Sequence, residues 1–330
     1  MTNDSTPKNH LPKYKLLEKY SQYVNNKTDA EIKVSKDKNL LFTSTIFSEH
    51  IDFSLSYFPL KHLGYKVIVA TMMEILTKNG LPTQVRINIA VSNRFSEEAI
   101  DELMGGIVFC CNKFKIDLVG LDFKSSATGL HICISMLGEV EEEKVVFPGG
   151  AKENELICVT GDLGSAYAGL ILLEREKKVF EADPSQQPDF IGVDYLLERY
   201  LKPEPPELWT RNASLLPFHP TSMINLKDGL AAGLIQLCNA SKLGCTIFEE
   251  KLPVEILTFD KLKELGIVAT TIALNGGEDY ELLFTIKQED YDKIKEMKEV
   301  SVIGYMTPEP SGRNIITNDN KQFELRAQGF

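Results

Sequence analysis

The chain has 330 residues, of which 43% are hydrophobic and 25% are charged, and its formal net charge is −11. These fractions are those of an ordinary globular protein, and the length is enough for two domains with their own cores. The negative charge argues against the phosphate backbone of a nucleic acid as a partner, because such binding draws on clustered Lys and Arg. Phosphorylated small molecules remain compatible with this charge, provided that divalent cations lie between the negative groups.

Membrane insertion and export are not expected from this sequence. No apolar run approaches the roughly 20 residues that cross a bilayer, and the polar N-terminus MTNDSTPKNHLPKYKLLEKY lacks the apolar core of an export signal. We therefore expect a cytoplasmic protein without membrane contact. The cysteines are scattered without CxxC spacing and most lie in apolar segments, which is typical of reduced, buried thiols.

The first half of the chain alternates strand and helix patterns. In chain order we expect a strand over 39–47, a helix from about 63 to 78, a strand over 84–92, a helix from Ser96 to 114, and strands over 116–123 and 129–140. A turn is expected at Asn79 and Gly80, and Ser96 begins a capping-box pattern before the second helix. The Gly-rich stretch FPGGAKENE follows and predicts a boundary between a domain at 1–147 and a domain at 148–330.

The second half repeats the pattern of strand, Gly-containing turn and helix. We expect it in 155–174 and again in 222–244, with later strands in 276–286 and 300–306 and a Pro-rich loop with a short helix between Asp183 and Pro220. The repetition predicts two α/β or α+β layers. Periodicity alone leaves open whether the sheets are parallel.

Several acids stand where an apolar segment ends. They are Asp122 in GLDFKSS, Asp228 in NLKDGL, and Glu278 and Asp279 in NGGED. Magnesium prefers hard oxygen ligands and takes one or two carboxylates from each direction, so acids at the ends of separate strands suit it. The same residues are also explained by local structure, because Asp228 could cap the helix that follows it and Asp122 could close its own turn.

The stretch GDLGSAYAGL, from Gly161 to Leu170, places glycines at a strand-to-helix turn. Such a turn exposes backbone N–H groups that can approach a phosphate. It lacks the Lys and Ser/Thr of a Walker loop and the spacing of a dinucleotide fingerprint, so a packing turn is the alternative. There is no GxSxG motif, the histidines show no ligand spacing, and His131 is expected to be a satisfied core residue.

The chain resembles the thiamine-monophosphate kinase family over nearly its whole length from about Pro12. The resemblance is carried by LGYKVIVATMMEILTKNGLP, DLVGLDFKSSATGLHICISMLGEV, GAKENELICVTGDLGSAYAGLILLEREKKVF, INLKDGL, NGGEDYELLFT and ELRAQGF. It implies the two-domain fold of the aminoimidazole ribonucleotide synthetase superfamily, with N-terminal domains that pair in a homodimer. It also implies transfer of the γ-phosphoryl group of ATP to thiamine phosphate, with magnesium ions between the anionic groups.

The resemblance also assigns roles to individual residues. It implies metal ligands at Asp29, Glu74, Asp122 and Asp228, the last two with catalytic roles. It implies a nucleotide contact at Gly120, with Gly161, Lys124 and Lys227 as further candidates for nucleotide contacts, and substrate contacts are expected at Asp52, Glu278, Asp279 and Phe330. The segment from Glu278 to Glu281 is the signature that shapes the second domain near the substrate.

Several positions depart from the family pattern. Family carboxylates are replaced by Thr28, Thr45 and Asn225, a family arginine by Pro148, and lysines stand at Lys124 and Lys227. Loss of an anionic ligand weakens a magnesium site, whereas the lysines offer direct charge to phosphate. A non-catalytic paralogue that binds a phosphorylated ligand or a partner is therefore the alternative to a kinase, and a changed substrate is a third reading.

Overall fold

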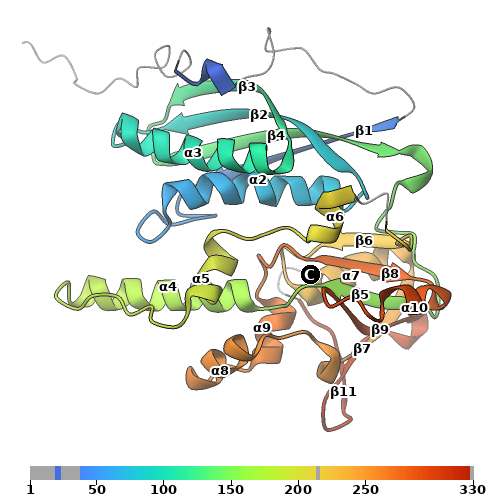
Figure 1. Ribbon diagram of the computed structural model, residues 1–330. Helices are drawn as coiled ribbons and strands as arrows, with labels where there is room; N and C mark the ends of the chain where they lie inside the picture. The colour runs from blue at the N-terminus through green and yellow to red at the C-terminus, as the bar shows by residue number, and fades with distance from the viewer. Residues whose placement is uncertain (1–18, 24–37, 213–215, 328–330) are drawn as a thin grey trace, which may run out of the picture. The chain divides into compact units, whose positions relative to one another are not determined.

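The computed structural model describes residues 19–23, 38–212 and 216–327 (Figure 1). These residues fall into two units. Unit 1 comprises the described residues of Met1–Ile75 together with Pro82–Glu139, and unit 2 comprises Leu76–Leu81 together with the described residues of Val140–Phe330. The predicted boundary between 147 and 148, and the role given to each domain, stay predictions.

Unit 1 is built on a four-stranded sheet whose strand order is β1-β4-β2-β3. Its elements are η1 (Ser21–Tyr23), β1 (Lys38–Ser48), α2 (Leu60–Leu76), β2 (Leu81–Val91), α3 (Glu97–Phe114), β3 (Asp117–Ser125) and β4 (Leu130–Glu141). Strands β2 and β3 pair in parallel, and α2 and α3 lie together on one side of the sheet (Figure 1). Strand β4 alternates buried and half-buried residues, as expected of a sheet with one covered face.

Helices α2 and α3 approach each other closely because glycines stand at their contact. A Cβ on Gly64 would overlap the carbonyl oxygen of Leu103, and one on Gly106 would overlap that of Lys61. The start of α3 confirms the predicted cap, since Ser96 accepts a hydrogen bond from the Ala99 N–H at 3.3 Å. Asn79 adopts φ 60° at the predicted turn after α2.

Unit 2 is built on a seven-stranded sheet with the order β11-β10-β7-β9-β5-β8-β6. Its strands are β5 (Leu156–Thr160), β6 (Ser222–Asn225), β7 (Leu243–Phe248), β8 (Leu282–Ile286), β9 (Val300–Pro308), β10 (Arg313–Ile316) and β11 (Gln322–Glu324). Its α-helices are α4 (Ser165–Ala182), α5 (Asp194–Leu201), α6 (Glu207–Asn212), α7 (Leu230–Ser241), α8 (Ile256–Glu264), α9 (Ala269–Asn275) and α10 (Tyr291–Ile294). Short 3-10 helices are η2 (Glu142–Lys144), η4 (Glu249–Lys251), η5 (Gln288–Asp290) and η6 (Glu309–Ser311).

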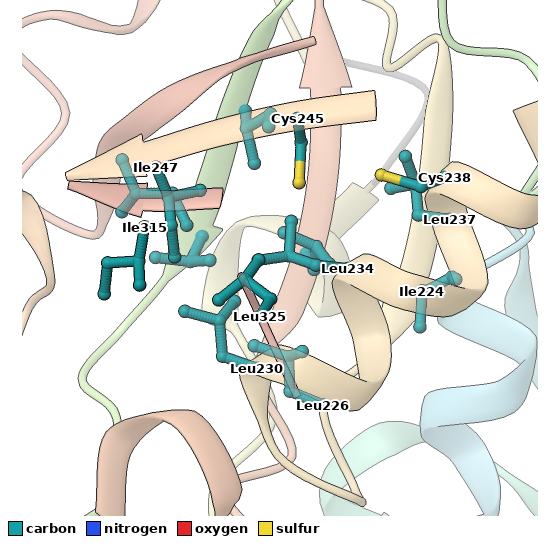
Figure 2. Packing of buried hydrophobic residues seen from close by; sticks show 14 of the residues in the cluster. Ile224, Leu226, Leu230, Leu234, Leu237, Cys238, Cys245, Ile247, Ile315 and Leu325 are labelled. Atoms are coloured by element: carbon teal, nitrogen blue, oxygen red, sulfur yellow. The ribbon is translucent and has the colours of Figure 1, made fainter. Parts of the chain in front are cut away.

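The sheet of unit 2 is mixed. Strands β7 and β10 pair in parallel, whereas β5 pairs antiparallel with both β8 and β9, and β6 pairs antiparallel with β8. Helix α7 packs its leucines on this sheet, and Figure 2 shows Leu230 and Leu234 on the side of the helix toward Ile315, with Leu237 beside Cys238. This packing positions the β6–α7 loop that carries Asp228.

The helices and strands that the sequence pattern predicts are present, but the pattern does not predict several further helices and strands. Strands β7, β10 and β11 and helices α8 and α9 were not predicted. The expectation that Asp122 stands at a turn is wrong, because β3 continues to Ser125 and Asp122 pairs in register with Asn88 of β2. None of the helices in the described ranges is both long enough and apolar enough to span a bilayer.

Candidate functional site

Two loops of unit 2 lie against each other and hold several of the predicted residues. The first loop joins β6 to α7 and contains Lys227 and Asp228, and the second precedes β8 and contains Glu278. The Glu278 N–H donates to the Lys227 carbonyl at 2.8 Å, and the Leu226 N–H donates to the Glu281 carbonyl at 2.9 Å. Three predicted residues are therefore brought together at the end of β6.

Asp228 does not cap the helix that follows it. Helix α7 begins at Leu230, its N-cap is Gly229, and no side chain makes a capping hydrogen bond there. Asp228 itself is exposed. The cap interpretation is therefore wrong, and the carboxylate lies at the surface beside a helix N-terminus.

Asp279 is directed into the protein instead. Its side chain is 1% exposed and accepts hydrogen bonds from the N–H groups of Gly164, at 2.9 Å, and Ala166, at 3.3 Å. Those groups form the N-terminus of α4, where the helix dipole favours a negative charge. Burial raises the pKa of Asp279 to about 7, while Arg199 and the Gly164 N–H act in the opposite direction.

Glu281 is buried in the same network. It accepts a hydrogen bond from the Thr160 hydroxyl at 2.5 Å and pairs with the Arg199 guanidinium at 3.0 Å. Burial raises the pKa of Glu281 to about 7, against the opposing effect of Arg199. Two of the acids in GGEDYE thus stabilise the fold, and Glu278 is the one that lies nearer the surface.

Arg199 of α5 is the cation at the centre of this network. It pairs with Asp162 at 3.3 Å and donates to the backbone carbonyls of Asp162, at 3.1 Å, and Asp279, at 3.3 Å. Burial lowers the pKa of Arg199, but the surrounding carboxylates of Glu281, Asp162 and Asp279 outweigh it and raise the pKa overall. One guanidinium therefore joins α5, the β5–α4 turn and the loop before β8.

The β5–α4 turn is a packing turn in this structure. Gly161 has φ 56°, its N–H donates to the Glu299 carbonyl at 3.0 Å, and a Cβ there would overlap the Glu281 carboxylate. The N–H groups of Gly164 and Ala166 are taken by Asp279. These contacts support the packing interpretation of GDLGSAYAGL over the phosphate-binding one.

A cleft of about 370 Å³ lies over the Arg199 network. Its walls come from the β5–α4 turn, α5 and the segment from Lys202 to Glu207. Tyr195 lines it and donates its hydroxyl hydrogen to Asp162 at 2.6 Å. Sequence reasoning missed Arg199, Asp162 and Tyr195. The available signal was an arginine among the leucines and tyrosines of DYLLERYL, in a chain whose GGEDYE segment requires a cation.

The predicted residues of unit 1 lie on separate elements. Glu74 is half-buried on α2, and Asp122 is half-buried on the edge strand β3. Lys124, two residues further along β3, is exposed on the same face as Asp122. Gly120 is buried under Arg86, whose side chain a Cβ at Gly120 would overlap.

Asp52 and His131 form local contacts near the end of β1. Asp52 accepts a hydrogen bond from the Ser48 N–H at 2.7 Å. His131 contacts the Ser48 hydroxyl at 3.2 Å and the Thr128 carbonyl at 2.9 Å, which confirms a satisfied histidine, although it is half-buried on β4 and not in the core.

Two predicted site residues, Asp29 and Phe330, lie outside the described residues. Within the described ranges, no three or more His, Cys, Asp or Glu side chains are grouped so that they could hold a metal ion. The metal ligands therefore stay predictions.

Comparison with known proteins shows a partial family match and more extensive similarities. Residues 27–140 match the family described as AIR synthase related protein, N-terminal domain. That match covers the first part of the chain, and the whole chain shares its fold with the solved structures described next.

Over most of its length the chain is similar to thiamine-monophosphate kinases. The Bacillus subtilis enzyme is 28% identical over 86% of this chain and 84% of its own length. The crystal structure of the Aquifex aeolicus enzyme superposes with a TM-score of 0.75 at 23% identity, over 94% of this chain and 97% of that chain. A complex of AaThiL with AMPPCP and TMP superposes equally well, with a TM-score of 0.75 at 23% identity, over 94% of this chain and 93% of that chain. The chain is thus similar to thiamine-monophosphate kinases over most of its length and shares their fold.

Proposed function

We propose that this protein is a kinase that transfers the γ-phosphoryl group of ATP to thiamine phosphate and forms thiamine diphosphate. The observation that carries the proposal is the similarity to named kinases over 86% of the chain. A similar fold in complex with AMPPCP and TMP supports a nucleotide and a phosphorylated acceptor as the two ligands. Direct in-line transfer needs no covalent enzyme intermediate, so the residues act by positioning and by charge.

In unit 2, Asp228 and Lys227 are the proposed functional pair. Asp228 is exposed, does not serve as a helix cap, and offers the hard carboxylate oxygens that magnesium prefers. Lys227, exposed beside it, offers a point charge for phosphate oxygens. Glu278 holds the Lys227 carbonyl through its N–H and so orients this loop toward a substrate.

In unit 1, the proposed metal ligands are Asp122, Glu74 and Asp29, of which the first also has a catalytic role. Asp122 and Lys124 share a face of the edge strand β3, so that strand offers both a carboxylate and a cation to a nucleotide. These donors fit magnesium by their chemistry. When bound, magnesium would neutralise the phosphate oxygens that otherwise repel one another. Gly120, Asp52 and Phe330 complete the proposed nucleotide and substrate contacts, whereas Gly161 and Asp279, which were expected to join them, serve packing instead.

We also propose that the protein is a cytoplasmic homodimer paired through the sheet of unit 1. The outer strand β1 carries Leu40, Phe42 and Ile46 on one face, and they are 44%, 68% and 64% exposed. Three exposed apolar side chains on one face of an outer strand favour burial against a second surface. Light scattering should give twice the chain mass, and Phe42→Asp should give the monomer mass; a monomeric parent protein would contradict the pairing.

A second candidate is a non-catalytic relative that binds a phosphorylated ligand. It is favoured by two polar side chains whose hydrogen bonds are local. The Thr71 hydroxyl donates to the Val67 carbonyl at 2.8 Å, and Asp52 accepts from the Ser48 N–H, so both side chains serve local structure.

One assay separates the two candidates. Purified protein with ATP, magnesium and thiamine phosphate should form thiamine diphosphate, and Asp122→Ala should abolish the product. Absence of product from the parent protein, together with calorimetric binding of ATP or thiamine phosphate, would favour the second candidate. Calorimetry with aminoimidazole ribonucleotides would reveal a changed substrate.

A further inference from the structure

Unit 2 has a second cleft, of about 400 Å³, that shares no lining residue with the cleft over Arg199. Four separate segments line it: the turn after α2, η2, the segment before β6, and the segment from the end of β8 into α10. Its lining residues include Lys144, His219, Lys287 and Lys293. Three lysines and an imidazole thus line one cleft in a protein whose formal net charge is −11.

This cleft lies at the other end of β6 from the proposed catalytic loop. Asp228 follows the carboxyl end of β6, whereas His219 precedes its amino end. Strand β8 pairs antiparallel with β6, with Ser222 opposite Thr285, so Lys287 emerges from β8 at the same edge as His219. A ligand in this cleft would therefore not occupy the loop of Lys227 and Asp228.

The lysines are held by carboxylates that an anion can replace. Lys293 pairs with Asp290 at 2.6 Å and Lys287 pairs with Glu289 at 3.3 Å, and the two lysine side chains are 48% and 55% exposed. Ion pairs at such exposure contribute little to stability, so their partners exchange readily. Lys144 likewise pairs with Glu141 at 2.8 Å, and an anion that displaces these exposed carboxylates would meet three positive groups in one cleft.

Two further groups narrow the chemistry of the ligand. Asn79 is 6% exposed, its Nδ2 donates to the Lys144 carbonyl at 3.2 Å, and its Oδ1 has no hydrogen-bond partner among the described residues. An unsatisfied buried acceptor favours a ligand that also donates a hydrogen bond. His219 is half-buried, and burial lowers its pKa, as does Lys144, whereas Asp290 raises it.

We propose that this cleft binds a phosphate group, either inorganic phosphate or the phosphomonoester of a small metabolite, through Lys144, Lys287, Lys293 and His219. A phosphate monoanion meets both requirements, because its charged oxygens pair with the lysines and its hydroxyl donates a hydrogen bond. Such a site is separate from catalysis and would let phosphate act on the protein as an effector.

The test uses the full chain and a readout local to the cleft. The His219 imidazole is followed by NMR through a pH titration, with and without inorganic phosphate, and in parallel with glycerol phosphate. Binding should raise the pKa of His219, since a bound anion favours the protonated ring over the effects of burial and Lys144. His219→Gln identifies the signal.

Matched lysine variants complete the test. The double variant Lys287→Gln, Lys293→Gln should weaken binding at least about tenfold, because each lost charged hydrogen bond is worth that much or more. Lys295→Gln, a similarly exposed lysine paired with Asp292 outside this cleft, should bind as the parent does. A response to only one of the two ligands identifies the source of the phosphate. The proposal is overturned if neither ligand at about 10 mM moves the His219 pKa, or if the double variant binds as well as Lys295→Gln does.

Discussion

The loop 225–229 and the segment 274–281 lie against each other, yet their acids have opposite surroundings. Asp228 is exposed beside a helix whose N-cap is Gly229, whereas Asp279 is 1% exposed and caps α4. Both segments place acids beside glycines, so residue type does not distinguish them. The difference arises from Arg199 and the α4 N-terminus, which stabilise buried carboxylates in one segment and are absent from the described contacts of Asp228. Acids that look alike in a motif therefore differ in burial, and only the exposed Asp228 keeps the functional role that we propose.

Replacement of Arg199 should have the largest effect on the buried acids. Arg199→Met should lower the free energy of unfolding by about 3–5 kcal/mol at pH 8, because it leaves buried carboxylates without their cation. Urea unfolding measures this change. Arg211→Met is the control, since Arg211 pairs with Glu207 at the surface and its loss should change stability by less than about 0.5 kcal/mol. Equal effects of the two variants would contradict a central role for Arg199.

The buried acids Asp279 and Glu281 should also make the free energy of unfolding depend on pH. Burial raises the pKa values of Asp279 and Glu281 to about 7, so the folded state binds more protons than the unfolded state between about pH 4.5 and 7. The contribution of each group to stability is therefore greatest at low pH and is lost as the pH rises, with a slope of up to about 1.4 kcal/mol per pH unit.

The difference between the parent protein and Asp279→Asn isolates one of these groups. The advantage of the parent should decrease as the pH rises through this window, measured by urea unfolding at a series of pH values. A difference that does not vary with pH would show that Asp279 is ionised in both states.

A smaller effect is expected at the β5–α4 turn. Gly161→Ala should lower the free energy of unfolding by about 1–2 kcal/mol more than Gly192→Ala. Both glycines have positive φ, but a Cβ at Gly161 overlaps the Glu281 carboxylate, whereas a Cβ at Gly192 has no neighbour within 4 Å. Thermal or urea unfolding compares the two variants. Equal losses would mean that Glu281 moves aside without cost.

Much of the architecture was predictable because it depends on local patterns. The cap at Ser96 and the alternation of β4 follow from side-chain chemistry and from period two. Strands β7, β10 and β11 were missed. They are short, and β7 follows α7 after a single C-cap residue, Lys242, so the pattern reads as the end of a helix.

The site was predictable only in part, because its contacts join distant segments. The acids of GGEDYE were noticed from their density, but their partners lie in α5 and at the start of α4, 80 and 115 residues away from Asp279. Local patterns carry no information about such pairs. The resemblance singled out Asp228 and Lys227, but their exposure and the lack of a capping bond required the structure.

The most direct test compares Asp228→Ala with Asp279→Ala in one experiment that measures both urea unfolding and formation of thiamine diphosphate. Asp228→Ala should leave the free energy of unfolding within about 0.5 kcal/mol of the parent and lower turnover at least about 100-fold. Asp279→Ala should lower the free energy of unfolding by about 1–3 kcal/mol, because it leaves the α4 N–H groups without an acceptor. If Asp228→Ala instead destabilised the protein as much as Asp279→Ala and kept full turnover, the division between functional and structural acids would be wrong.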